Sequence, residues 1–567
     1  MRLGGLLTAD GFRKTYPQPV MQRLASHFTG TARYNGTVTV RDHQVVVAVD
    51  SSLSGLALDL PAPLGKPALD AMPLRFVLTS GLTPDAGGAL HDDIRINLGS
   101  GVAAHYQRDK KARTEGATWQ LVRGGIGVNT PAPEPDSGLA FNINMAAINA
   151  DAWLDFGQRV AGDSTAAGAS TNPGDTGGAD FSQYVVPDAI AARTSELLIG
   201  DRKLENVVVG VTRHRGVWQA NIDSTQANGH LTWSEPSAGH GLGKVTARLS
   251  SLVIPASASK EVADLLDGKG SAAATIPALD VHIDRFELFN KPLGQLDLQA
   301  NNVQLRDARE WRINKLSLAN ADGELTGTGK WVTREGRHTT SLNFDLAILD
   351  AGKLLDRFGF AGAVRNGKGS LKGDIAWAGL PYAMDLPSLS GQIVMNVEKG
   401  QFLKQDPGAA KLLGVLSLQA LPRLLKLDFH DVFSEGLAFD GLTANAAIER
   451  GIVRTENLKM HGMAATVLMD GTADIANELT NLHVVVIPEV NLGTAPLVYA
   501  LAVNPVIGLG SFLAQLFLSA PVMKALTYHM QVTGPWKSPN IVKLDNPAAN
   551  EASAQSAGKA APKTGKQ

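Results

Sequence analysis

Apolar and polar residues alternate in short runs, and this alternation limits more than any other feature how the chain can fold. In TSLNFDLAILDAG (340–352), Leu342, Phe344 and Leu346 fall on one side, with Asn343 and Asp345 on the other. A period of two is typical of a β-strand with one dry face and one wet face. The same character recurs in LALDL, LGQLDLQANNVQL and LHVVVI. The chain is therefore predicted to be mainly β.

Two interpretations of the dry faces remain open on pattern alone. They could pack against a second sheet, as in a β-sandwich, or line an open apolar groove. The 59 glycines separate the short runs, as expected of many strands and turns. About 20–25 strands, spaced ~4.8 Å apart, would make one long sheet.

A weak internal repeat favours an array of hairpins over several closed globules. GVWQANIDSTQANGHLTW (216–233) aligns with REWRINKLSLANADGELTGTGKW (309–331), with a tryptophan near each end and Gly229 and Gly323 at the expected turns. A looser third copy lies at 451–474. Repeats of this kind predict a quasi-linear architecture, and chance similarity among hairpins is the alternative.

The chain is predicted to have four regions. They are a short N-terminal segment at 1–30, a repetitive β region at 31–405 with helical insertions and a flexible loop at 161–180, a C-terminal region with apolar helices at 406–545, and a disordered tail at 546–567. Helical spacing appears in INADAWLDFGQRV (148–160). The loop at 161–180 is rich in Ala, Gly, Ser and Thr and cannot hold a core.

Residues 490–523 contain no charged side chain, but prolines and glycines break them into short pieces. A membrane span, a helical element at a membrane surface or groove end, and a buried helix pair all remain possible. The N-terminal run MRLGGLLTADGFRK is too short for a signal-peptide core. An export signal is therefore expected to lie outside this chain.

Charge and composition exclude several classes of partner. The chain has 52 basic and 54 acidic residues and no basic stripe, so it is not predicted to bind nucleic acid. It has no cysteine, which excludes disulfides and thiolate metal sites.

Motifs for catalysis are missing as well. HDD (91–93) and DFHD (428–431) place histidine beside carboxylates, but each fits a solvated turn or strand end better than an acid–base pair. The glycine-rich runs GGIGVN (124–129) and GLGSF (508–512) lack the strand–glycine–helix order of a phosphate loop and are interpreted as turns. No enzyme activity, catalytic residue, metal or cofactor is predicted.

Several stretches carry a family resemblance. They are SSLSGLALDLPAPLGKPALDAMPLRF (51–76), the run from GQFLKQDPGAAKLLG to LMDGTADI (400–475), VVVIPEVNLGTAPLVYALAVNPVIGLGSFLAQLF and YHMQVTGPWKSPNI. Together they resemble the C-terminal half of the YhdP family, within the AsmA-like superfamily. The resemblance is most specific in its last 150 residues or so, and the insert at 161–180 departs from it.

The resemblance implies a periplasmic protein of the Gram-negative envelope, anchored to the inner membrane by an N-terminal helix that this chain lacks. It implies a long, curved, repetitive antiparallel sheet that forms an elongated apolar groove, with a few amphipathic helices mostly toward the C-terminus. The implied role is part of a bridge that moves phospholipid between the inner and outer membranes and supports the outer-membrane barrier. Its partners would be phospholipid, both membranes and envelope proteins. The alternative is a non-catalytic envelope scaffold that carries no lipid.

Two sets of residues are candidates for this role. The predicted groove-lining residues are Leu56, Leu58, Leu296, Leu298, Leu342, Phe344, Leu346, Val484 and Val486. The predicted contacts with a membrane or partner are Leu412, Leu416, Leu497, Leu501, Phe512, Leu516 and Phe517.

Overall fold

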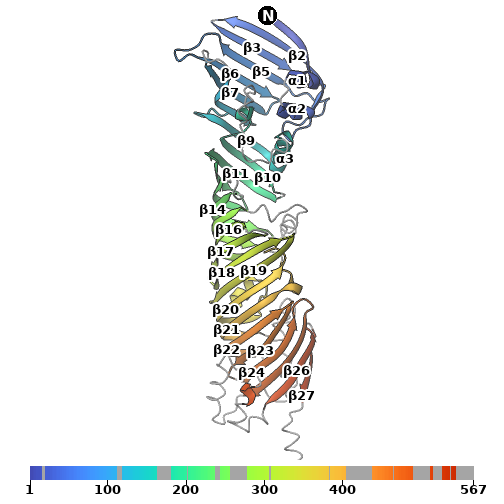
Figure 1. Cartoon of the computed structure of the whole chain (residues 1–567), viewed down its shortest axis with the longest axis vertical. Coiled ribbons are helices and arrows are strands. Elements are labelled where there is room, and N and C mark those ends of the chain that lie inside the picture. Colours follow the sequence, from blue (N-terminus) through green and yellow to red (C-terminus); the bar gives the residue numbers. More distant parts are fainter. Residues whose placement is uncertain are drawn as a thin grey trace, which may run out of the picture. The chain divides into compact units, whose positions relative to one another are not determined.

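The structure is a computed structural model of the chain (Figure 1). It describes residues 1–15, 19–41, 43–111, 118–161, 181–200, 202–235, 243–255, 277–304, 308–381, 384–403, 437–463, 465–488, 511–514, 527–536 and 538–544. The chain divides into two compact units, residues 1–261 (unit 1) and 262–567 (unit 2).

In its described residues, unit 1 is built on a sheet with three α-helices and one 3-10 helix. Its strands are β1 (Arg2–Thr8), β2 (Phe28–Arg41), β3 (Gln44–Ser51), β4 (Leu56–Leu58), β5 (Leu74–Gly81), β6 (Ala89–Leu98), β7 (Val102–Lys111), β8 (Gln120–Val128), β9 (Gly138–Asn149), β10 (Ala189–Ile199), β11 (Arg202–His214), β12 (Val217–Asp223), β13 (Ala227–Ser234) and β14 (Lys244–Ile254). Its helices are α1 (Ala9–Thr15), α2 (Pro19–Ser26), α3 (Ala150–Ala161) and η1 (Phe181–Tyr184).

Most neighbouring strands of unit 1 are antiparallel, but β9 pairs in parallel with both β8 and β10. Between two parallel strands, the connection must run back from the end of the first strand to the side of the sheet where that strand began. The return from β8 to β9 passes over two glycines of β8. A methyl group on Gly125 would overlap the backbone of Pro133, and one on Gly127 would overlap the backbone of Thr130 and Pro131. The run GGIGVN is therefore mostly strand, which corrects its interpretation as a turn.

The helices α1, α2 and α3 lie together along one edge of unit 1 (Figure 1). Arg23 of α2 donates to the carbonyl of Val160 at 2.6 Å, and Trp153 of α3 donates to the carbonyl of Ala62 at 3.1 Å. Near them, β4 pairs with β2 and closes a small core. That core contains Ala32, Leu53, Leu56 and Leu58.

Unit 2 contains the strands β15 (Ala278–Leu288), β16 (Lys291–Gln304), β17 (Arg309–Asn320), β18 (Gly323–Arg334), β19 (Arg337–Ile348), β20 (Val364–Ala378), β21 (Ser390–Phe402), β22 (Leu437–Glu449), β23 (Ile452–His461), β24 (Ala465–Asp474), β25 (Leu479–Pro488), β26 (Tyr528–Pro535) and β27 (Asn540–Leu544). Its described helices include α5 (Ala351–Arg357), η3 (Leu386–Ser388) and a single turn at 511–514.

Every strand of unit 2 pairs antiparallel with the next strand in the chain, so the unit is one continuous meander (Figure 1). Its largest buried cluster lies on β20–β26 and includes Val364, Phe402, Phe439, Met460, Met469, Val484 and Met530. A second cluster surrounds Trp311 and Trp331, and a third surrounds Ile375 and Trp377.

The predicted fold class is confirmed: the described chain is mainly β, in long repetitive sheet with few helices. The predicted helix at 148–160 is α3. The repeat aligns the hairpins β12–β13 and β17–β18, in which Trp218 faces Trp233 and Trp311 faces Trp331. Gly229, predicted at a turn, lies inside β13 where the register with β14 shifts.

The predicted region boundaries stay predictions. Segment 1–30 contributes β1, which pairs with β2 along its whole length. The loop at 161–180 lies outside the described residues apart from the backbone of Ala161, and the tail at 546–567 lies outside them entirely.

Candidate functional site

The two faces of unit 2 differ in chemistry, as the alternation in β19 predicts. Leu342, Phe344 and Leu346 lie on one face, which we call the apolar face of unit 2. Asn343 and Asp345 lie on the other, the polar face, where Asp345 forms an ion pair with Lys372 of β20 at 2.7 Å. Because residues opposite each other in neighbouring strands share a face, the strand register extends both faces across the sheet.

Rows of apolar residues cross the strands of this face without a charged side chain. One row runs over seven successive strands, β15 to β21, through Ile283, Leu296, Leu318, Leu325, Leu346, Leu371 and Met395. The next runs over the same strands through Val281, Leu298, Leu316, Gly327, Phe344, Gly373 and Ile393. The register thus joins five of the predicted groove residues (Leu296, Leu298, Leu342, Phe344 and Leu346) into one surface.

Glycines in the second row leave space for the Phe344 ring. A methyl group on Gly373, directly opposite in β20, would lie 2.5 Å from Cε1 of Phe344. The ring therefore lies over the backbone of β20 and fills the place where a side chain would stand. This packing smooths the apolar face at that point.

The apolar face is only partly covered along these rows. Leu296, Leu298, Leu342, Phe344 and Leu346 are all half-buried in the structure. Their partners on the polar face, such as Asn343 and Gln299, are exposed. This stretch of sheet keeps apolar surface accessible.

The other four predicted groove residues lie in packed protein. Val484 and Val486 of β25 are 0% and 3% exposed and belong to the largest cluster of unit 2. Leu56 and Leu58 of β4 are each 9% exposed and form part of the small core of unit 1. These residues contact other side chains of the chain in this structure.

Among the predicted membrane or partner contacts, Phe512 alone is described. It is 0% exposed, and Nζ of Lys459 lies 5.6 Å from its ring centre. Burial lowers the pKa of Lys459. Leu412, Leu416, Leu497, Leu501, Leu516 and Phe517 lie outside the described residues.

Unit 1 has an apolar face of the same kind, which sequence reasoning largely missed. One row passes through Val49, Phe76, Ile96, Ala104, Ile126, Phe141, Ile190, Val211, Ala220 and Leu231. Tyr106 lies in a neighbouring row, where its hydroxyl donates to the carbonyl of Tyr184 in η1 at 3.1 Å. Burial and the nearby Tyr184 raise the pKa of Tyr106 to about 12, so it stays a neutral donor.

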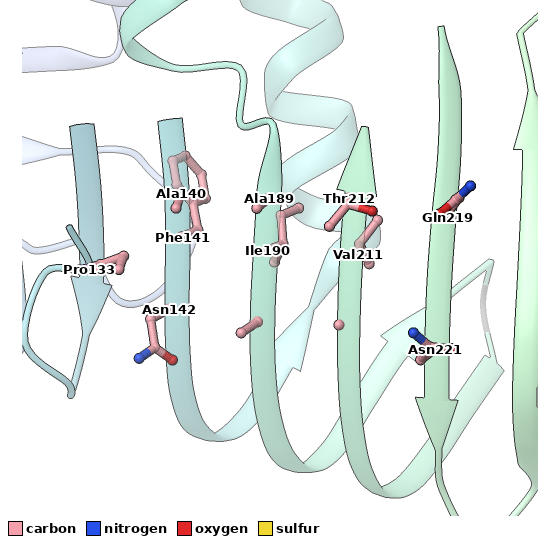
Figure 2. Close-up of a pocket in the computed structure, with 12 residues that line it drawn as sticks. Pro133, Ala140, Phe141, Asn142, Ala189, Ile190, Val211, Thr212, Gln219 and Asn221 are labelled. Carbon is pink, nitrogen blue, oxygen red and sulfur yellow. The ribbon is translucent and has the colours of Figure 1, made fainter. Parts of the chain in front are cut away.

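A shallow pocket of about 400 Å³ lies where β9 to β12 run side by side (Figure 2). Pro133 and small or neutral residues line it, including Ala140, Ala191, Gly210 and Asn221. None of the described residues that line it is ionisable.

The histidine–carboxylate pairs lie on the polar faces. His91, in β6 rather than ahead of a strand, contacts Asp109 at 2.6 Å and Asp85 at 3.0 Å, and these contacts raise its pKa. His282 contacts Asp297 of β16 at 2.7 Å in the same cross-strand manner. Within the described residues, no group of three or more His, Cys, Asp or Glu could hold a metal ion. The DFHD run lies outside those residues.

Comparison with known proteins places these faces in a family. A sequence profile described as YhdP protein matches residues 1–541. The intermembrane phospholipid transporter YhdP of Escherichia coli strain K12 is 24% identical over 522 residues, which cover 87% of this chain and 37% of that protein. The chain thus spans little more than a third of that relative's length. In the part of the chain that the structure describes, no helix is both long and apolar enough to cross a membrane.

Proposed function

The chain belongs to the YhdP protein family, and from that premise we propose that it forms part of a bridge-like carrier of phospholipid. In this proposal the acyl chains lie along the apolar faces, and the lipid moves along the apolar rows from one strand to the next. The carrier works in the periplasm between the inner and outer membranes and supports the outer-membrane barrier. It acts without catalysis.

The observation that supports this most is the pair of apolar rows from β15 to β21. A diacyl phospholipid has roughly 30 methylenes, and exposing each to water costs about 0.8 kcal/mol. Unassisted passage through water would therefore cost on the order of 20 kcal/mol. A continuous apolar surface removes most of this barrier with no chemistry, so long sheet with one apolar face suits the task.

Photocrosslinking to lipid tests the proposal. A photoreactive amino acid at position 344, on the apolar face, is expected to crosslink phospholipid in the purified chain, as read by mass spectrometry. The matched control is the same probe at position 343, on the polar face of the same strand, which should give no lipid adduct.

A charge on the apolar face provides the second half of the test. Phe344→Asp should abolish lipid crosslinking at position 342 while the far-ultraviolet circular dichroism stays that of a β protein. Equal crosslinking at positions 343 and 344, or stable protein free of phospholipid after gentle purification, would favour the non-catalytic envelope scaffold.

A further inference from the structure

Charged residues interrupt the apolar face of unit 1 at Arg108 of β7. Its Nε and Nη2 both donate to Oδ2 of Asp92 in β6, at 2.8 and 2.7 Å. Its guanidinium carbon lies 4.8 Å from the ring centre of Trp119. We call Asp92, Arg108 and Trp119 the first dipolar site.

The register places this site on the apolar face. Asp92 faces Arg108 across β6 and β7, two positions from the pair Ile94 and Tyr106. Side chains two positions apart on a strand share a face. The Asp92 side chain is 2% exposed, and its Oδ1 is buried without a hydrogen-bond partner.

A second site repeats the arrangement. In β11, Arg213 lies beside Val211 on the apolar face, and its guanidinium carbon is 5.4 Å from the ring centre of Trp218. Its Nη2 lies 3.3 Å from Oε1 of Glu235, which also accepts from Nε1 of Trp218 at 2.8 Å. We call Arg213, Trp218 and Glu235 the second dipolar site.

Both sites lie on the same side of the sheet of unit 1, where the C-terminal ends of β7 and β11 lie. Strand β8 is antiparallel to β7, both β9 and β10 are parallel to β8, and β11 is antiparallel to β10. Strands β7 and β11 therefore run in the same direction, and each arginine lies near the C-terminal end of its strand. Four strand steps separate the sites, about 19 Å at the usual strand spacing.

Both sites present unused donors, and the second site also presents an unused acceptor. Nη1 of Arg108, and Nε and Nη1 of Arg213, make no hydrogen bond or ion pair with the residues that the structure describes. The arginine side chains are 23% and 34% exposed. Oε2 of Glu235, whose side chain is 33% exposed, likewise accepts no hydrogen bond from the described residues, whereas the unpaired Oδ1 of Asp92 is fully buried. A partly buried ion pair adds little stability by itself, so stability alone does not account for two such pairs on an apolar face.

We infer that the dipolar sites bind the headgroup of a zwitterionic phospholipid that carries a phosphodiester and a primary ammonium. The free guanidinium N–H groups donate to phosphate oxygens. The free Oε2 of Glu235 accepts from the ammonium. The indole and the neighbouring apolar rows contact the first part of the acyl chains. The inference rests on the proposed function. The headgroup can reach the dipolar sites only if the acyl chains lie on the apolar face.

Native mass spectrometry with short-chain lipids tests the inference on the full chain. The probes are dioctanoyl phosphatidylethanolamine, dioctanoyl phosphatidylglycerol and dioctanoylglycerol. The wild type is expected to bind the ethanolamine lipid best. Arg213→Gln and Glu235→Gln should each weaken that binding about tenfold, the effect of losing one charge-assisted contact, and leave dioctanoylglycerol binding unchanged.

One further variant serves as a control, and another tests the first site. Arg75→Gln removes a charge that pairs with Asp50 at 3.3 Å on the polar face, so lipid binding should not change. For the first site, Arg108→Gln alone would leave Asp92 buried and unpaired, so Arg108→Gln is combined with Asp92→Asn.

The outcomes separate the two proposals. The headgroup assignment fails, and lipid carriage stands, if the Arg213→Gln and Glu235→Gln variants both bind dioctanoyl phosphatidylethanolamine as tightly as the wild type does. It also fails if the wild type binds dioctanoyl phosphatidylglycerol as tightly as dioctanoyl phosphatidylethanolamine. If neither the ethanolamine lipid nor dioctanoylglycerol binds the wild type, the proposed function itself fails.

Discussion

Among the described residues, four glycines each lie directly opposite an aromatic residue of the neighbouring strand whose ring covers them. The pairs are Gly5 with Tyr34, Gly124 with Tyr106, Gly373 with Phe344 and Gly400 with Phe439. In each pair, a methyl group on the glycine would lie 2.9 Å or less from the ring or overlap it. The ring covers the bare backbone of the glycine, which protects the ladder there. A glycine at these positions is thus required by its neighbour's side chain and not by a turn.

Gly373→Ala is expected to destabilise the protein by about 1–3 kcal/mol, the usual cost of forcing a methyl group into filled space. The matched control is Gly441→Ala in β22, where nothing lies within 4 Å of the added methyl group. That change should be neutral or stabilise by up to about 1 kcal/mol. The midpoints of urea unfolding measure both, and equal midpoints for the two variants would contradict the packing of Phe344 on Gly373.

His282 gives a pH-dependent contribution to stability. Its hydrogen bond to Asp297 is the main cause that raises its pKa above the ordinary value of 6.5. Asp284 at 3.3 Å acts in the same direction, and Lys315 lies 4.0 Å from Asp297. Because the folded-state pKa is raised, the stabilisation is fully present below pH 6.5 and is lost as the pH rises through the higher folded-state value.

His282→Gln should therefore lower stability more at pH 5.5 than at pH 8.5. Both side chains are about one-third exposed, so the effect at low pH is about 0.5 kcal/mol. Chemical unfolding of wild type and variant at the two pH values measures the difference. A difference that grows toward pH 8.5 would have the wrong sign.

At the scale of elements, β8 is packed closely on both of its faces. Its glycines leave room for the Tyr106 ring on one face and for the backbone of residues 130–133 on the other. Only a strand without side chains at these positions allows the return connection to pass close enough for β9 to pair in parallel. The parallel pairing thus depends on the same residues that looked like a turn in the sequence.

Gly125→Ala is expected to displace the connection between β8 and β9 and to expose it to protease. The control is Gly210→Ala in β11, where a methyl group meets nothing within 4 Å. Limited proteolysis followed by mass spectrometry should find new cleavage within residues 129–137 for the first variant only. Unchanged cleavage in Gly125→Ala would show that the connection does not depend on the bare backbone of β8.

The strands and their faces could be predicted from the sequence because period-two alternation is local, as in Leu342, Phe344 and Leu346. The rows could not, because they depend on register, which a single strand does not reveal. The burial of Val484 and Val486 could not be predicted either, because a strand that packs against protein and a strand that contacts lipid can have the same apolar sequence. The first dipolar site joins Arg108 of β7 to Asp92 of β6 and to Trp119, which precedes β8, and no local motif marks it.

At the scale of the whole molecule, both units carry an apolar face crossed by directly paired residues. The natural chain has no cysteine, so each introduced cysteine is a unique label. Leu78→Cys in unit 1 and Leu298→Cys in unit 2 should be protected from maleimide when phospholipid is bound. Arg95→Cys and Asn343→Cys, on the polar faces, should react equally with and without lipid. Lipid protection in one unit alone would limit the carrier surface to that unit.

The consecutive pairing of unit 2 has a consequence for how such proteins change in evolution. Because each strand bonds only to its sequence neighbours, duplication or loss of one hairpin adds or removes about 9.5 Å of span and preserves chain direction. Both faces keep their character, since every remaining residue keeps its side. Genes for such chains can therefore lengthen or shorten in uniform increments without any new fold.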